Sequence, residues 1–200
     1  MKLLNKLLFG VLILLATKVS AQVITWEPLF PIDTDSVTIV FDASQGNGAL
    51  EDVSPPIYAH TGVITNLSTG PSNWRYVKAG WTTNLPAAQM LSLGNNLYRI
   101  GFKIREYYGV PASEQILQLA FVFRNADGSI VGRAADAGDI FMPVYQPGLY
   151  SAFTQPAVRP AYVNEGENFN VRVQTSQNAD INLLVNNISI ATADNTQQLD

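Results

Sequence analysis

Aromatic side chains set among polar residues are the part of this sequence best suited to binding chemistry. Residues 57–81, IYAHTGVITNLSTGPSNWRYVKAGW, contain the single histidine, His60, and two of the three tryptophans, Trp74 and Trp81. Indole and phenol rings are flat and largely apolar, so they can stack on the C–H faces of sugar rings while polar neighbours bond to the hydroxyls. This window therefore indicates a binding surface that needs neither a metal ion nor a proton transfer.

Alternation along residues 57–65 predicts a strand that places Tyr58 and His60 on one face. The polar run that follows predicts a loop carrying both tryptophans, of which Trp74 is the stronger candidate. A place in the core is the alternative for either tryptophan, and a structural role is the alternative for His60. The candidate ligand-binding residues are Trp74, Tyr58, His60, Trp81, Tyr76, Lys78, Asn125 and Asp127.

The run Asn125-Ala-Asp127-Gly-Ser first predicts a β-turn, because Asp-Gly favours one. A small polar site that contacts a sugar hydroxyl or a calcium ion is the alternative for this turn. Apart from that calcium ion, we expect no cofactor.

Composition disfavours most other kinds of site. The chain has no cysteine and one histidine, which excludes thiolate chemistry and disfavours both a histidine zinc site and a Ser-His-Asp triad. Its 12 basic residues are scattered and its net charge is −4, so nucleic acid is not an expected partner. GxSxG, HExxH and phosphate-loop motifs are missing, as is strand–helix alternation. We therefore expect no catalysis within these 200 residues.

The first 21 residues have the pattern of an export signal. Lys2 and Lys6 flank the start of a run, LLFGVLILLA, that is shorter than the roughly 20 apolar residues of a spanning helix. Small residues ending at Ala21 offer a signal-peptidase site, so we expect cleavage after Ala21. The mature protein is then expected to be secreted or on the cell surface without membrane insertion; an uncleaved signal anchor is the alternative.

Short runs of β-favouring residues separated by turn residues predict an all-β protein. About eight such runs and no sustained helical period predict a β-sandwich over residues 22–146. The secondary structure of the segment 104–114, IREYYGVPASE, is ambiguous, and Pro111 argues against a helix that runs through it. The expected strands are 24–31 at an edge, 37–43, 57–65, 89–94 and 97–104 joined by an Asn95-Asn96 turn, 116–125 in the centre, and 139–145.

The chain changes character after residue 146. Residues 147–160 are rich in proline and predict a linker or the entry to a second unit. Residues 161–200 contain three further strand-like runs, with Asn186-Asn187 as a hairpin turn, but too few to close a sandwich. They predict an incomplete β-domain at the front of a longer protein.

Several segments resemble a known family. The strings VTIVFDASQGNGAL, IYAHTGVITNLST, NWRYVKAGW, LGNNLYRI, IREYYGVP and LQLAFVFRNADGS are similar to the amino-terminal module of secreted bacterial α-amylase-family enzymes (glycoside hydrolase family 13). Their order also resembles starch-binding modules of carbohydrate-binding families 25 and 26. The resemblance spans residues 23–145, and the region that follows resembles the Ig-like segment that precedes a catalytic barrel in such enzymes.

The resemblance implies a non-catalytic module that binds α-glucan, with a downstream catalytic domain of the same chain as a partner. It puts the ligand platform at Tyr58, His60 and Trp74 and at the turn of Asn125 and Asp127. Residues 133–136 stand where such modules carry a tryptophan–asparagine run, so stacking from that side is not expected. The alternatives are a structural spacer that packs on a neighbouring catalytic domain and an adhesin-type surface domain.

Overall fold

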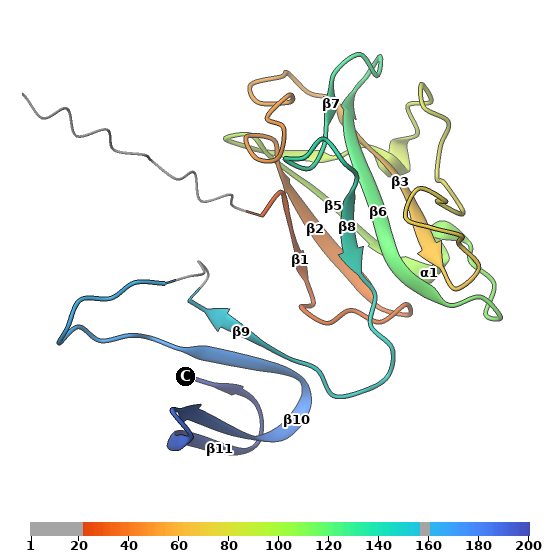
Figure 1. The fold of residues 1–200 in the computed structure, drawn as a ribbon. Coiled ribbons are helices and arrows are strands. Elements are labelled where there is room, and N and C mark those ends of the chain that lie inside the picture. Colours follow the sequence, from red (N-terminus) through yellow and green to blue (C-terminus); the bar gives the residue numbers. More distant parts are fainter. Residues whose placement is uncertain (1–21, 157–160) are drawn as a thin grey trace, which may run out of the picture.

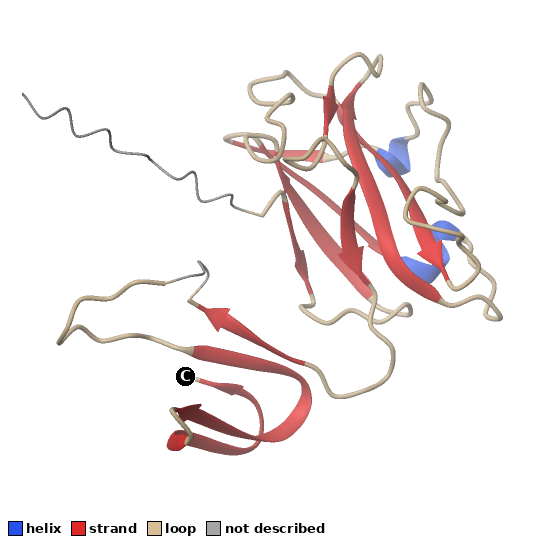
Figure 2. Ribbon diagram, in the orientation of Figure 1, coloured by secondary structure: helices blue, strands red, loops and turns tan. Residues whose placement is uncertain are grey.

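A computed structural model describes residues 22–156 and 161–200, so the predicted signal peptide lies outside the described residues. The described chain is almost entirely β-structure, with short helical turns, which confirms the predicted all-β fold of the sandwich type (Figures 1 and 2). Within the described residues, no helix is long and apolar enough to cross a membrane.

The first unit consists of two antiparallel sheets (Figure 1). Its elements are β1 (Ile24–Glu27), β2 (Ser36–Asp42), β3 (Ile57–Thr65), η1 (Pro86–Ala88), β4 (Leu91–Gly94), β5 (Leu97–Lys103), α1 (Ile104–Tyr108), β6 (Ile116–Asn125), β7 (Val131–Gly132) and β8 (Ile140–Pro143). One sheet has the order β1-β2-β5-β4, and the other has the order β3-β6-β7, with β8 also paired to β6. The predicted edge position of β1 and central position of β6 are both confirmed.

Turn chemistry explains where several of these strands begin and end. Asn95 and Asn96 have φ angles of 49° and 64°, a left-handed conformation that asparagine tolerates, and they connect β4 to β5 as predicted. The segment after β5, whose structure the sequence did not decide, contains the short helix α1. Gly109 ends this helix in a left-handed conformation with φ 72°. Pro111 follows just beyond the helix, consistent with its inability to continue one.

The core lies between the two sheets of the first unit. Alternate residues of β2, Val37, Ile39 and Phe41, are buried, as the alternation in the sequence predicts. Phe41 stacks on Phe123 of β6 with ring centroids 3.9 Å apart, so this pair joins the two sheets directly. The third tryptophan, Trp26, packs against the same core.

The second unit contains β9 (Ser151–Gln155), β10 (Arg172–Val185) and β11 (Ile188–Leu199), which form a three-stranded sheet in the described part of the chain. Strand β9 falls inside the segment 147–160 that the sequence assigns to a linker, and it pairs with β10. Strand β10 runs through residues that the sequence divides into two strands, with register shifts where that division was expected. Asn186 and Asn187, at φ 50° and 64°, form the predicted turn.

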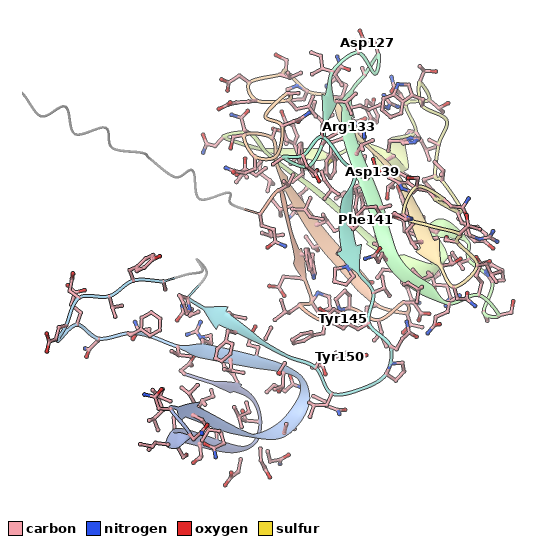
Figure 3. The ribbon with its side chains drawn as sticks, viewed as in Figure 1. Asp127, Arg133, Asp139, Phe141, Tyr145 and Tyr150 are labelled. Carbon is pink, nitrogen blue, oxygen red and sulfur yellow. The ribbon has the colours of Figure 1, made fainter. Side chains whose placement is uncertain are left out.

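Aromatic rings connect the two units. Tyr145 follows β8, Tyr150 precedes β9, and their ring centroids are 4.6 Å apart (Figure 3). Phe30, from the loop after β1, lies 5.3 Å from Tyr145 and 6.3 Å from Tyr150. Three rings therefore pack together where the chain passes from one unit to the other.

Candidate functional site

The loop between β3 and β4 lies along the outer edge of β3. Val63 and Arg75 exchange two backbone hydrogen bonds of 2.9 and 2.8 Å, and the Lys78 N–H donates to the Thr61 carbonyl at 2.9 Å. Near the other end of the strand, the Met90 N–H donates to the Ile57 carbonyl at 2.9 Å. These backbone bonds hold the loop against the strand, so its aromatic side chains have fixed positions.

Gly62 is what allows the loop to approach β3 so closely. A Cβ atom at this position would lie 3.0 Å from the Arg75 carbonyl oxygen and 3.3 Å from Trp74 Cβ. Any larger side chain would push the loop away from the strand. The glycine in the YAHTG string thus explains how Trp74 comes to lie over the face of β3.

Three of the predicted residues come together there, and we call His60, Trp74 and Trp81 the aromatic platform. The His60 ring lies 5.9 Å from the Trp74 ring with 30° between their planes, and 5.0 Å from the Trp81 ring at 74°. His60 and Trp74 are half-buried, whereas Trp81 is 38% exposed. The platform therefore presents partly exposed aromatic surface with its rings held by mutual contact.

Trp81 also packs against the turn that follows β6. A Cβ atom at Gly128 would lie only 2.8 Å from Trp81 Nε1, so the indole lies directly on this turn. Gly128 adopts φ 74°, which a residue with a side chain adopts only under strain. The turn of Asn125 and Asp127 therefore borders the platform through its backbone.

The side chains of Asn125 and Asp127 are occupied within this turn. Asn125 accepts a hydrogen bond from the Ile130 N–H, and Asp127 accepts from the N–H and the hydroxyl of Ser129 at 2.9 and 2.6 Å. The hydrogen bonds from Ser129 lower the pKa of Asp127. No group of three histidine, aspartate or glutamate side chains in the described parts of the chain is placed to hold a metal ion. The geometry thus favours the turn over the calcium or sugar-hydroxyl contact.

Tyr58 shares the strand face with His60 but lies beneath the surface. It is 7% exposed, and its ring packs against the guanidinium of Arg124, 5.1 Å away, which is also its register partner on β6. Arg124 is itself 2% exposed. Arg124 is not among the residues predicted from the sequence, although a single charged residue in the apolar run ILQLAFVFRN is a signal that points to it.

Tyr76 points away from the platform, and its prediction as a ligand contact is not supported by the geometry. Its backbone φ of 50° turns the side chain toward Glu114, to which its hydroxyl donates at 2.5 Å. Arg75 and Thr65 donate to the same carboxylate. The buried Glu114 therefore anchors the loop through Arg75 and Tyr76.

Lys78 also lies outside the platform. Its ammonium group donates to the Tyr107 carbonyl and sits 4.7 Å from the centre of the Tyr107 ring. Both contacts attach the loop to α1. Tyr76 and Lys78 thus hold the loop that carries the tryptophans, rather than facing the same surface.

The hydrogen bonds from Arg75, together with those from Thr65 and Tyr76, hold the pKa of Glu114 down to about 2. Because the folded state favours the ionised carboxylate, this stabilisation is present above the ordinary pKa of about 4.5 and is lost as the pH falls toward 2. We expect Glu114→Gln to lower the free energy of unfolding at pH 7. The difference in this free energy between wild type and variant should disappear as the pH falls from 5 to 2. Urea unfolding at several pH values in this range measures the free energy, and Glu51→Gln, at an exposed position, is the control. A difference from wild type that does not change with pH would contradict the stabilising role of the ionised Glu114.

Charged residues border the platform on the side of β8. Arg133 and Asp139 form an ion pair of 2.9 Å in the loop before β8 (Figure 3). Burial and the nearby Arg124 charge lower the pKa of His60, whereas Asp139 acts in the opposite direction. The lowered pKa favours the neutral form of the His60 imidazole. Arg133 of this ion pair belongs to residues 133–136, which stand where the starch-binding modules that the chain resembles carry a tryptophan–asparagine run.

Phe141 of β8 lies on the same sheet face and was not singled out from the sequence (Figure 3). Ala120 of β6 pairs with Gly62 on one side and with Phe141 on the other, so these residues form one row across the sheet. Phe141 is half-buried. The predicted strand 139–145 does not alternate clearly between polar and apolar residues, so the sequence alone did not show which face Phe141 occupies.

The sequence profile of one protein family, described as a domain of unknown function (DUF8578), matches residues 24–131. This range covers more than half of the chain and includes β3, the loop with both tryptophans, and β6. A search of curated proteins found no match to the chain. By the extent of the profile match, the chain belongs to the DUF8578 family.

Proposed function

We propose that residues 22–146 form a non-catalytic carbohydrate-binding module that holds α-glucan by aromatic stacking. The observation that carries the proposal is the aromatic platform, in which the His60 ring lies 5.9 Å from the Trp74 ring and 5.0 Å from the Trp81 ring. Indole faces stack on sugar rings, and the neutral imidazole of His60 can exchange hydrogen bonds with hydroxyls. Trp81 provides the most exposed ring.

The choice of α-glucan rests on the resemblance to starch-binding modules, which includes the strand of His60 and the loop of Trp74. The same resemblance supports an α-amylase-like glycoside hydrolase as the parent protein, exported by its signal peptide, with catalysis in a downstream domain of the same chain. Exposed apolar side chains of the second sheet support packing against a neighbouring domain; they include Leu184, Val185, Ile188 and Ile190.

Affinity electrophoresis tests the proposal directly. The chain from Gln22 to Asp200 is run in native gels with and without amylopectin, and in gels with a soluble β-glucan as the matched polysaccharide. We expect retardation by amylopectin alone. Since one or two stacked rings bind weakly, the retardation should be concentration-dependent and should benefit from the many sites along a polymer. A folded protein that migrates equally in all gels would contradict the proposal.

A second candidate function is that of a structural spacer. The observation that favours it is the packing of Phe30, Tyr145 and Tyr150, which ties the first unit to the second. A spacer needs a fixed orientation between domains but no ligand. This candidate therefore predicts no retardation by any polysaccharide, and the same gels distinguish the two functions.

A further inference from the structure

Arg124 is a buried cation that has no carboxylate partner among the described residues. It is 2% exposed and takes part in no ion pair of the described chain, and its Nε has no hydrogen-bond partner there. Burying a charge without a counter-ion is costly unless other groups replace its hydration. The groups that surround this guanidinium should therefore reveal what it does.

The guanidinium bonds to two separate loops with its terminal nitrogens. On the loop after Trp81 it donates to the Thr83 carbonyl at 2.8 Å and to Asn84 Oδ1 at 2.9 Å. On the turn after β6 it donates to the carbonyls of Asn125 and Ala126 at 2.9 and 3.1 Å. A planar group with several fixed donors can serve acceptors on both sides at once, which an ammonium group cannot do in this geometry.

Both loops border Trp81. Thr83 lies two residues after the indole, and Gly128, against which the indole packs, lies two residues after Ala126. If the bonds to one loop are lost, the indole loses either its own backbone support or the turn it packs on. The orientation of Trp81 relative to His60 therefore depends on both sets of bonds.

We propose that Arg124 is a positioning residue of the aromatic platform: one buried guanidinium joins the loop of Thr83 and Asn84 to the turn of Asn125 and Ala126 and so fixes Trp81. The consequence for ligand affinity rests on the proposed function, whereas the consequence for Trp81 does not. Arg124 acts through the loops and does not touch the ligand. Burial lowers the pKa of the His60 imidazole most, and the charge of Arg124 lies close enough to lower it further.

The experiment follows Trp81 itself by ¹⁹F NMR of the chain from Gln22 to Asp200, labelled with 5-fluorotryptophan. Its three tryptophans, Trp26, Trp74 and Trp81, are assigned by single Trp→Phe variants. The test variant is Arg124→Lys, which keeps the charge but not the fork of donors. Asn84→Ala removes one acceptor from an exposed loop position and serves if Arg124→Lys does not fold. Arg99→Met, at an exposed position of β5, is the control for loss of an arginine.

We expect the Trp81 resonance to shift or broaden in Arg124→Lys and, to a smaller extent, in Asn84→Ala, while the Trp26 resonance stays in place. Affinity for amylopectin should fall about tenfold in Arg124→Lys, which corresponds to roughly 1.4 kcal/mol. Arg99→Met should change neither. Lower thermal stability with an unchanged Trp81 resonance would overturn the proposal, since it would make Arg124 a stabilising residue only. If Trp81 moves but wild type does not bind amylopectin, positioning stands and the proposed function fails.

In ¹H–¹⁵N spectra of Arg124→Met, the pKa of His60, the single histidine of the chain, should rise because a neighbouring positive charge has been removed. Because burial also lowers this pKa, the comparison requires a variant that circular dichroism shows to be folded. An unchanged pKa in a folded variant would contradict the proximity of the guanidinium to the platform.

Discussion

Trp74→Ala combined with Trp81→Ala is expected to abolish retardation by amylopectin, and each single variant is expected to weaken affinity about tenfold. An aromatic ring contributes both buried apolar area and a stacking geometry, together worth on the order of 1–2 kcal/mol for a partly exposed ring. Because the two indoles contact His60 from different sides, at 5.9 and 5.0 Å, losing one also leaves the imidazole less well held. The cost of loosening His60 is then counted in both single losses, so the double variant should lose less than their sum but more than either alone.

Affinity gels with increasing amylopectin give the dissociation constants, and circular dichroism checks that each variant is folded. Trp26→Phe is the matched control, because Trp26 packs on the core beside β1 and donates a hydrogen bond to the Leu29 carbonyl, outside the platform. It should leave retardation unchanged. If the folded double variant is retarded as strongly as wild type, α-glucan binds outside the aromatic platform.

Phe123→Ala is expected to reduce the free energy of unfolding by about 3–5 kcal/mol, the usual cost of removing a fully buried phenylalanine ring. The ring is 0% exposed, stacks on Phe41 at 3.9 Å, and lies 5.9 Å from Phe121. Since it belongs to β6 and Phe41 belongs to β2, the cavity would open at the direct contact between the two sheets. For a chain of this size the melting temperature should fall by roughly 10 °C.

Urea unfolding followed by far-ultraviolet circular dichroism measures this loss. Leu91→Ala is the control, since Leu91 is 56% exposed on the edge strand β4 and should change stability by less than about 0.5 kcal/mol. At temperatures where Phe123→Ala remains folded, its affinity for amylopectin should match wild type. A stability equal to that of Leu91→Ala would mean that the sheets do not pack through this ring pair.

The strands were predictable because their evidence is local. Val37, Ile39 and Phe41 alternate with less buried residues, and this period of two identifies both the strand and its inward face. The Asn95-Asn96 turn was predictable for the same reason, since asparagine tolerates a positive φ. Strand β9 was missed because its five residues lie between prolines, which dominate the composition of the segment, while its pairing with β10 is a tertiary contact.

The platform was predictable only in part. Two tryptophans beside polar residues and the alternation in β3 led to three rings, those of His60, Trp74 and Trp81, that the structure brings together. The direction of loop side chains depends on backbone dihedral angles that no periodic pattern records, so Tyr76 and Lys78 could not be separated from Trp74. Arg124 could not be placed in the site because its role depends on the register of β6 with β3 and on carbonyls of two distant loops.

The backbone pairing of the tryptophan loop with β3 has a consequence for how copies of this chain behave toward one another. Strand β3 ends its sheet, and an uncovered outer strand can pair with a strand of another molecule. Here the bonds from Arg75, Lys78 and Met90 already occupy carbonyls along that border. The segment that carries the platform therefore also shields the sheet from intermolecular strand pairing. Selection on this loop would then act on solubility as well as on recognition, and changes that detach it would favour self-association.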